Sequence, residues 1–208
     1  VQTLHLQITD ECDAGCDFCG DGELIPRQGC NSCLRWTHRG GQKATPEDTS
    51  RLLDDLRELD VRAVVISGGN PLLEPERLLS LAAELRRARP GIGITVASNG
   101  GGMSDALGEA IKARGMTMSF SVFGSTPEEY GVVTGTPELH AQLLSAVAVC
   151  RAQGIAYQIT LVRTPSARER CEDLYEFGLS LGGNDLSFTE LLPRGDNLVK
   201  PRFRGGAP

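Results

Sequence analysis

The chain has 208 residues, 40% of them hydrophobic, which is enough to bury the core of one α/β domain. Acidic residues outnumber basic ones by 27 to 21 and the formal net charge is -6, so the chain offers no broad basic surface for nucleic acid. No apolar run approaches the roughly 20 residues of a membrane span, and the first residues lack a secretion signal. We therefore expect a cytoplasmic protein that binds neither nucleic acid nor membrane.

Six short apolar segments rich in β-branched residues predict buried strands at residues 4–9, 63–67, 93–98, 117–123, 156–162 and 186–190. Helical spacing predicts five helices at residues 46–59, 75–89, 104–114, 137–153 and 167–181. Threonine before proline, at Thr45-Pro46 and Thr136-Pro137, is the pattern of a helix start with its N-cap. The alternation predicts an α/β fold with parallel strands and right-handed crossovers, and six units favour a partial (β/α)6 barrel similar to a TIM barrel.

The chain is expected to form one core domain, residues 1–192. Within it, residues 20–41 are irregular and glycine-rich, which indicates a cysteine-bearing insertion after the first strand. Residues 193–208 have the composition of a loop and are interpreted as a C-terminal tail. Whether a longer extension follows that tail stays open.

Five of the seven cysteines fall between residues 12 and 33, a clustering typical of metal ligands and not of disulfides. Cys12, Cys16 and Cys19 directly follow the first predicted strand, at the edge where parallel α/β folds build their sites. Three thiolates leave a four-ligand zinc site incomplete. They can hold three irons of a [4Fe-4S] cluster and leave the fourth iron open for a ligand.

The spacing C-x3-C-x2-C, with Phe18 just before Cys19, resembles the signature of the radical S-adenosylmethionine (radical SAM) superfamily. The resemblance implies a [4Fe-4S] cluster on Cys12, Cys16 and Cys19 and S-adenosylmethionine as cofactor. It also implies an oxygen-sensitive enzyme in which an electron from the cluster cleaves the cofactor and a 5'-deoxyadenosyl radical removes hydrogen from a substrate. A flavodoxin- or ferredoxin-like protein is the implied electron donor.

A second resemblance follows the second predicted strand. Gly68-Gly69-Asn70-Pro71 is similar to the family's Gly-Gly-Glu-Pro segment, whose glycines let the main chain approach the methionine ammonium of the cofactor. Asn70 stands where the family usually has glutamate, so its amide oxygen would lack the charge-assisted part of that hydrogen bond. The alternative is that Asn70 forms a turn before the proline.

Individual residues on the later predicted strands also resemble residues of the family. Ser98 and Asn99 resemble a polar segment at the end of the family's third strand, although Asn-Gly is also an ordinary turn. Ser121, with Ser119 on the same strand face, resembles the serine that contacts the cofactor's carboxylate or ribose, and either serine can instead be an interior hydroxyl. The resemblance places three further residues on the adenine side: Thr160, Val162 and Leu192.

Two segments, residues 130–135 and 191–195, resemble members that modify ribosomally made peptides, which implies the SPASM/Twitch-like branch and a peptide substrate. In that branch an auxiliary cluster is held by cysteines beyond the sixth strand, whereas here none follows Cys171. Cys30 and Cys33 therefore keep four interpretations: an auxiliary iron-sulfur cluster, a zinc site, a redox pair or a substrate-handling thiol. Metal ligation is favoured, because their spacing is that of half a metal site.

Two other functions stay open. A protein with the same fold could bind without catalysing, if Asn70 prevents productive cofactor binding. A zinc-binding interaction module could form if Cys30 or Cys33 closes a tetrahedron with the three clustered cysteines.

Overall fold

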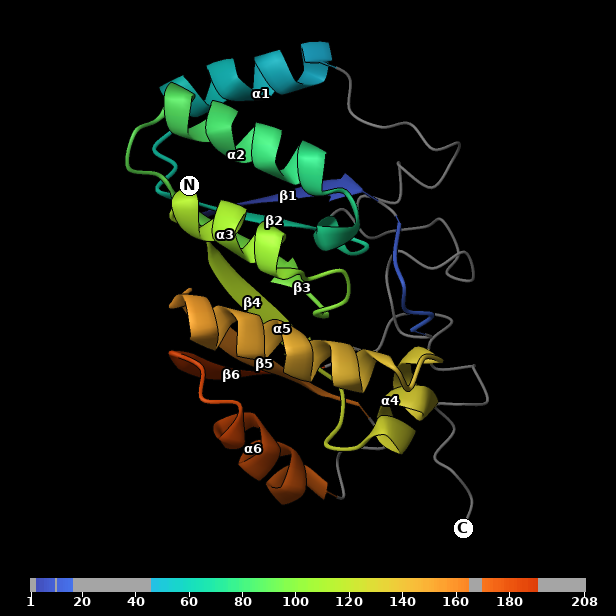
Figure 1. Cartoon of the computed structure of the whole chain (residues 1–208). Helices are drawn as coiled ribbons and strands as arrows, with labels where there is room; N and C mark the ends of the chain where they lie inside the picture. The colour runs from blue at the N-terminus through green and yellow to red at the C-terminus, as the bar shows by residue number, and fades with distance from the viewer. Residues whose placement is uncertain (1–2, 10, 17–45, 165–169, 191–208) are drawn as a thin grey trace, which may run out of the picture.

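The structure is a computed structural model, and it describes residues 3–9, 11–16, 46–164 and 170–190 (Figure 1). The strands are β1 (Thr3–Thr9), β2 (Ala63–Gly68), β3 (Gly93–Ser98), β4 (Thr117–Val122), β5 (Tyr157–Arg163) and β6 (Asp185–Glu190). The helices are α1 (Pro46–Glu58), α2 (Pro75–Ala88), α3 (Asp105–Ala113), α4 (Pro127–Thr134), α5 (Leu139–Gln153) and α6 (Cys171–Ser180), with a 3-10 turn η1 (Pro71–Leu73).

Several predicted features lie outside the described residues. They are the insertion at 20–41, the tail at 193–208, and the side chains of Phe18, Cys19, Cys30, Cys33 and Leu192. In the part of the chain that is described, no helix is both long enough and apolar enough to cross a bilayer.

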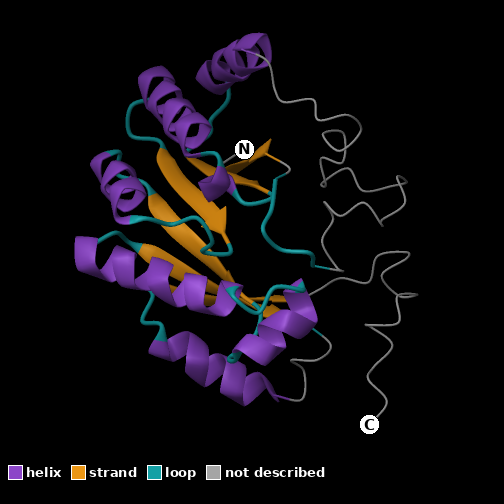
Figure 2. Ribbon diagram, turned by 45° about the vertical axis from the view of Figure 1, so that its right-hand side comes forward, coloured by secondary structure: helices purple, strands orange, loops and turns teal. Residues whose placement is uncertain are grey.

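The six strands form one parallel sheet in the order β1-β2-β3-β4-β5-β6. A strand order that follows the chain order is that of an opened barrel, because a doubly wound sheet would reverse direction after its first strands. The helices lie on one side of the sheet, and the other side carries none of the described helices (Figure 2). The predicted α/β fold with a partial barrel is confirmed.

The two faces of the sheet differ in polarity because successive side chains on a strand point to opposite faces. Val64, Ile66 and Phe120 are fully buried under the helices, and burying each such side chain stabilises the fold by about 1.5–3 kcal/mol. The opposite face, here called the inner face, carries shorter polar side chains. On the last four strands these include Thr95, Thr117, Ser119, Ser121, Gln158, Thr160 and Ser187.

Helix α4 was not among the predicted helices. It begins with Thr126 as N-cap, whose hydroxyl accepts from the Glu129 N–H at 3.3 Å, and with proline at its first position. Its sequence carries the same start signal as the predicted helices, but only eight residues follow and these include a glycine and two valines, which are poor helix formers.

The predicted start of the next helix was wrong. Helix α5 begins at Leu139 without a side-chain cap, two residues after the expected position. The Thr136 hydroxyl, expected to cap it, instead donates to the main-chain oxygen of Asp13 at 3.1 Å.

Candidate functional site

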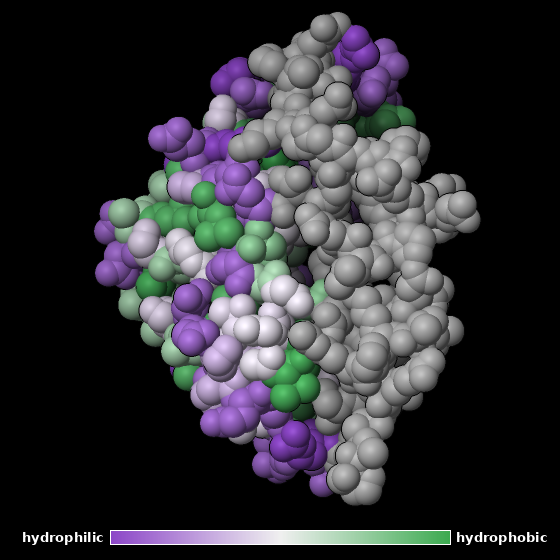
Figure 3. Space-filling view, turned by 90° about the vertical axis from the view of Figure 1, so that its right-hand side faces the viewer, coloured by the Kyte–Doolittle hydropathy of each residue, from purple (hydrophilic) through white to green (hydrophobic). Residues whose placement is uncertain are grey.

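The carboxyl ends of the strands meet at one edge of the sheet, at the right in Figure 1. The loops after β1, β2, β3 and β4 gather there, which is where parallel α/β folds place their ligands. Figure 3 turns this edge toward the viewer, and its described part carries a mixture of hydrophilic and hydrophobic side chains. The edge is therefore the candidate site.

Cys12 and Cys16 lie on the loop that follows β1, at this edge. The Cys12 side chain is exposed, whereas Cys16 is half-buried and packs against the hydrophobic core. Within the described ranges no three His, Cys, Asp or Glu side chains form a metal-binding group, and the predicted third ligand, Cys19, lies outside those ranges. Two thiols of a predicted three are thus placed where an iron-sulfur cluster could be held.

The first predicted glycine brings β2 against the end of β1. Gly68 has φ 144°, and a Cβ added to it would lie 2.3 Å from the main-chain oxygen of Thr9. Only glycine fits there. The next amide, Gly69 N–H, donates to that same Thr9 oxygen at 2.8 Å, and Asn70 N–H donates to Glu11 O at 2.7 Å. The cysteine loop is therefore attached to the second strand by main-chain hydrogen bonds.

Asn70 is completely buried and uses its whole side-chain amide. Its Nδ2 donates to Asp13 Oδ1 at 3.1 Å and to Gly101 O at 2.9 Å. Its Oδ1 accepts from the Ser98 hydroxyl at 2.8 Å and from the Leu72 N–H at 3.3 Å. Two donors and two acceptor positions are all that a primary amide has. Asn70 thus forms the turn that begins η1 and joins three loops.

Asp13 lies between Cys12 and Cys16, and its carboxylate is held by two amides. Oδ1 accepts from Asn70 Nδ2 and from Asn99 Nδ2, the latter at 2.6 Å. The two partners are 57 and 86 residues away in the chain. Together they fix the cysteine loop to the ends of β2 and β3.

Two details complete this arrangement. The Asn99 Oδ1 accepts from Gly101 N–H at 2.9 Å, and a Cβ added to Gly101 would lie 1.8 Å from Asp13 Oδ2. We call the side chains of Asp13, Asn70, Ser98 and Asn99 the Asp13 cluster. All of them except that of Asp13 are at least nine-tenths buried.

The other side of the cysteine loop is held by the connection between α4 and α5. Gly15 N–H donates to the main-chain oxygen of the buried Thr134 at 2.7 Å. The Thr136 hydroxyl donates to Asp13 O, as described above. The loop that carries Cys12 and Cys16 is therefore fixed from both sides, before any metal contributes.

The predicted residues of β4 and β5 form a separate group on the inner face. The Ser119 hydroxyl lies 3.5 Å from the Thr160 hydroxyl, which in turn lies 3.2 Å from that of Ser187 on β6. Ser121 is half-buried on the same face of β4, and Val162 on β5 is 6% exposed. These residues share a face of the sheet, but no hydrogen bond within the described part of the chain joins them to the Asp13 cluster.

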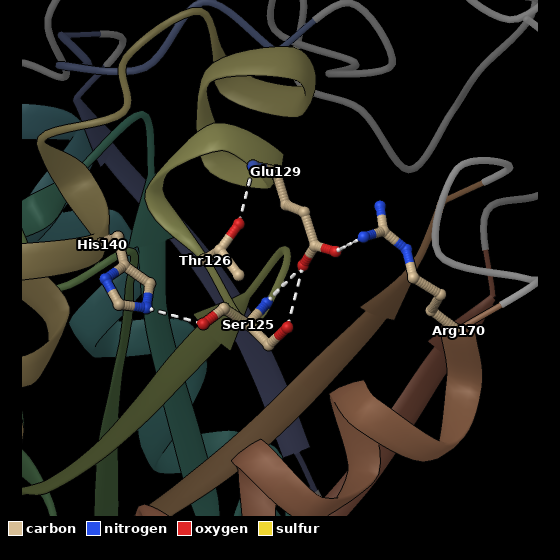
Figure 4. Close-up of polar contacts among 5 residues, drawn as sticks. All are labelled: Ser125, Thr126, Glu129, His140 and Arg170. Carbon is tan, nitrogen blue, oxygen red and sulfur yellow. Dashed lines mark hydrogen bonds and ion pairs between the residues drawn. The ribbon is translucent and has the colours of Figure 1, made fainter.

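A second polar cluster fixes the loop after β4, and we call it the Glu129 cluster (Figure 4). Glu129 Oε2 accepts from the N–H and hydroxyl of Ser125 at 2.6 and 3.1 Å, and Oε1 pairs with Arg170 Nη1 at 2.7 Å. His140 Nε2 lies 3.1 Å from Ser125 O. This cluster joins the loop after β4 to α4, α5 and the residue before α6.

Hydrogen bonding and burial shift the pKa of ionisable groups beside the Glu129 cluster and in the core. The backbone N–H of Glu128, at the start of α4, and the Thr126 hydroxyl hold the pKa of the exposed Glu128 carboxyl below its usual value. Cys150 on α5 is fully buried in the hydrophobic core, and this burial raises the pKa of its thiol to about 11.

Asp13, Gly101 and Thr136 were not identified from the sequence as site residues. One feature of the sequence could have pointed to Asp13: it is a charged residue between two of the clustered cysteines, and alanine and glycine follow it. Gly101 belongs to a run of three glycines after β3, which is a weaker signal. The sequence pattern around Thr136 predicted a different role for it, that of a helix cap.

Comparison with known proteins shows which family the chain is similar to. The family model for the radical SAM superfamily matches residues 6–177. The chain is 26% identical over 200 residues to a probable GTP 3',8-cyclase from Pyrobaculum aerophilum, covering 94% of this chain and 59% of that protein. It is 23% identical over 183 residues to a PqqA peptide cyclase from Streptomyces rochei, covering 87% of this chain and 46% of that protein.

Among solved structures, anSMEcpe with bound AdoMet and the Kp18Cys peptide matches with a TM-score of 0.70 at 14% identity. The match covers 91% of this chain and 52% of that one, and it shows the shared fold. The chain spans about half the length of such relatives. With a family model that matches most of its length, from β1 into α6, the chain belongs to the radical SAM superfamily.

Proposed function

We propose that the protein is an enzyme that cleaves S-adenosylmethionine reductively and uses the resulting radical to remove hydrogen from a substrate. The observation that carries this proposal is the loop of Cys12 and Cys16, which lies at the carboxyl edge of a partial barrel and is fixed there by the Asp13 cluster. The superfamily match over residues 6–177 supports it.

The residues present fit the two cofactors that the superfamily implies. Thiolates are the ligands of iron-sulfur clusters, and an exposed Cys12 beside a half-buried Cys16 can reach a cluster at the surface of the edge. We propose Cys19 as the third ligand. When bound, the cluster supplies the electron that breaks a carbon-sulfur bond of S-adenosylmethionine.

In this chemistry the chain's own residues bind and orient S-adenosylmethionine. Gly68 and Gly69 form a segment without side chains at the edge, where the main chain can approach a cofactor closely. The hydroxyls of Ser119, Ser121 and Thr160 on the inner face can donate hydrogen bonds to the carboxylate of the cofactor, and can both donate to and accept from its ribose hydroxyls. Their proposed role is binding and not proton transfer.

We further propose a ribosomally made peptide as the substrate. The similarity to a PqqA peptide cyclase over 87% of the chain supports this class. The similarity to a GTP 3',8-cyclase makes a guanine nucleotide the competing class. A flavodoxin- or ferredoxin-like electron donor and a second metal at Cys30 and Cys33 belong to the same proposal.

The experiment is anaerobic reconstitution with iron and sulfide, reduction with dithionite, and chromatographic measurement of 5'-deoxyadenosine formed from S-adenosylmethionine. Cys16→Ala is expected to lose both the cluster absorbance and the product. Cys150→Ala, which removes a buried thiol far from the edge, is the matched control and is expected to keep both. A wild-type protein that holds the cluster and forms no product would refute the catalytic proposal.

The same assay separates the substrate classes. Candidate peptides or GTP are added to parallel reactions in deuterated form, and deuterium in 5'-deoxyadenosine identifies the hydrogen donor. Transfer from GTP with none from any peptide would replace the peptide by the nucleotide.

A further inference from the structure

S-adenosylmethionine carries an ammonium group, and a protein binds such a cation best with a carboxylate that can accept its hydrogen bonds. Position 70 has asparagine, which is neutral, and all four hydrogen-bonding positions of its amide are occupied inside the protein. It is also completely buried. In this arrangement Asn70 has no hydrogen-bonding capacity left for a ligand.

A carboxylate lies one hydrogen bond away from that amide. Asp13 is adjacent to Cys12 and three residues before Cys16, and its side chain is only partly buried. Oδ1 takes both amide donors, from Asn70 and Asn99. No described group donates to Oδ2, so one carboxylate oxygen keeps its accepting capacity.

The charge of Asp13 is not compensated by its described neighbours. Both of its side-chain partners are neutral amides, and no ion pair among the described residues includes it. Neutral donors orient a carboxylate and leave its net negative charge in place. Such an oriented charge, fixed at Oδ1 and with an Oδ2 that lies beside Gly101 without a described hydrogen-bond donor, is suited to receive a cation.

Two other described carboxylates, those of Glu74 and Glu11, lie near the end of β1 and are arranged differently. Glu74 accepts from the Thr9 hydroxyl at 2.8 Å and pairs with Arg77 at 3.6 Å. The Glu11 side chain is exposed to solvent, although its main chain is part of the loop. Asp13 alone among these three combines an amide-fixed oxygen with one that accepts no hydrogen bond from the described residues.

We propose that Asp13 is the residue that binds the ammonium of S-adenosylmethionine in this protein. Asn70 then acts as a positioning residue, which holds the Asp13 carboxylate in place through the 3.1 Å hydrogen bond. This inference rests on the proposed function, because it assumes that the edge binds that cofactor. The negative charge that binds the ammonium is then on the cysteine loop, at Asp13, because the residue at position 70 is neutral.

The test is calorimetric binding to the anaerobic, cluster-loaded protein, with two ligands: S-adenosylmethionine and its analogue without the amino group. Asp13→Asn keeps the shape of the side chain and can keep the hydrogen bonds at Oδ1. It is expected to weaken S-adenosylmethionine binding about tenfold, the value of one charge-assisted hydrogen bond, and to leave the analogue's affinity unchanged. Glu11→Gln, which removes a carboxylate on the other side of Cys12, is the matched control and is expected to change neither affinity.

Several results would overturn the inference. One is that Asp13→Asn loses the same affinity for both ligands, and another is that it loses affinity for neither. A third is that Glu11→Gln shows the same selective loss of affinity for S-adenosylmethionine. Iron content is measured for each variant, and Asp13→Ser serves as a second neutral variant. If neither neutral variant takes up iron at the wild-type level, the role of Asp13 is structural and the binding role is wrong. A cluster-loaded wild type that binds S-adenosylmethionine but forms no product would refute only the catalytic proposal, whereas one that does not bind would overturn both.

Discussion

The Asp13 cluster and the Glu129 cluster hold loops at the same edge of the sheet in different ways. The first joins residues up to 86 positions apart, and its centre is the fully buried Asn70 amide. The second is largely local, since Glu129 bonds to Ser125 four residues earlier, and its one ion pair uses an Arg170 side chain that is 54% exposed. The difference indicates that the first cluster sets the position of the cysteine loop, whereas the second supports one connection.

The largest expected effect is that of removing the centre of the Asp13 cluster. Asn70→Ala leaves buried partners on Ser98 and Gly101 unsatisfied, and we expect a loss of about 3 kcal/mol in unfolding free energy. Urea denaturation of the wild type and the variant measures it. Asn184→Ala is the control, because this exposed amide accepts one hydrogen bond, from Tyr157 N–H, and should cost about 1 kcal/mol. If both variants lose the same unfolding free energy, Asn70 is no more important to stability than an exposed asparagine with one hydrogen bond.

A side chain at Gly101 tests whether Asp13 occupies the described position. Gly101→Ala would place a methyl group 1.8 Å from Asp13 Oδ2, and we expect it to cost about 2 kcal/mol through displacement of that side chain. In an Asp13→Ala background the same substitution should cost less than half as much, which a double-mutant cycle measures. If the two costs are equal, Gly101 is constrained by something other than Asp13.

The Glu129 cluster should be less sensitive. Glu129→Ala leaves the Ser125 N–H without its acceptor and is expected to cost about 1–2 kcal/mol. Arg170→Ala removes only an exposed ion pair and is expected to cost less than about 1 kcal/mol. Thermal unfolding of both variants shows which of them loses more stability. A larger loss for Arg170→Ala would mean that the ion pair, and not the local hydrogen bonds, holds the loop.

The smallest effect concerns pH. Because the folded-state pKa of Glu128 is lowered, its charge stabilises the folded protein above the carboxyl's unfolded pKa, and this contribution is lost as pH falls through the folded value. Glu128→Gln should therefore be slightly less stable than the wild type at neutral pH and equal to it in acid. Denaturation at a series of pH values checks this, and a difference that does not change with pH would contradict it.

The sequence predicted the fold better than the contacts within the site. The parallel partial barrel follows from the alternation of short β-branched strands and capped helices, since both patterns are local. The motif residues Cys12, Gly68 and Asn99 were placed at strand ends for the same reason. Short α4 was missed because its composition is a weak helix signal, although its start signal was present.

The hydrogen bonds of the Asp13 cluster could not be predicted, because they depend on how three strand ends meet in space. No spacing in the chain relates Asp13 to Asn70 and Asn99, which are 57 and 86 residues away. Thr136 shows the same limit, since its local pattern indicated a helix cap and the folded chain uses its hydroxyl to hold the cysteine loop. Tertiary contacts decided both roles.

We propose that the cysteine loop, as fixed by the Asp13 cluster, holds an iron-sulfur cluster with one iron open to S-adenosylmethionine. Electron paramagnetic resonance of the anaerobic, dithionite-reduced protein, with and without S-adenosylmethionine, tests it most directly. The claim predicts the spectrum of a [4Fe-4S] cluster that changes when the cofactor is added and that is absent from Cys16→Ala. A colourless protein with stoichiometric zinc, or a cluster spectrum that the cofactor leaves unchanged, would contradict it.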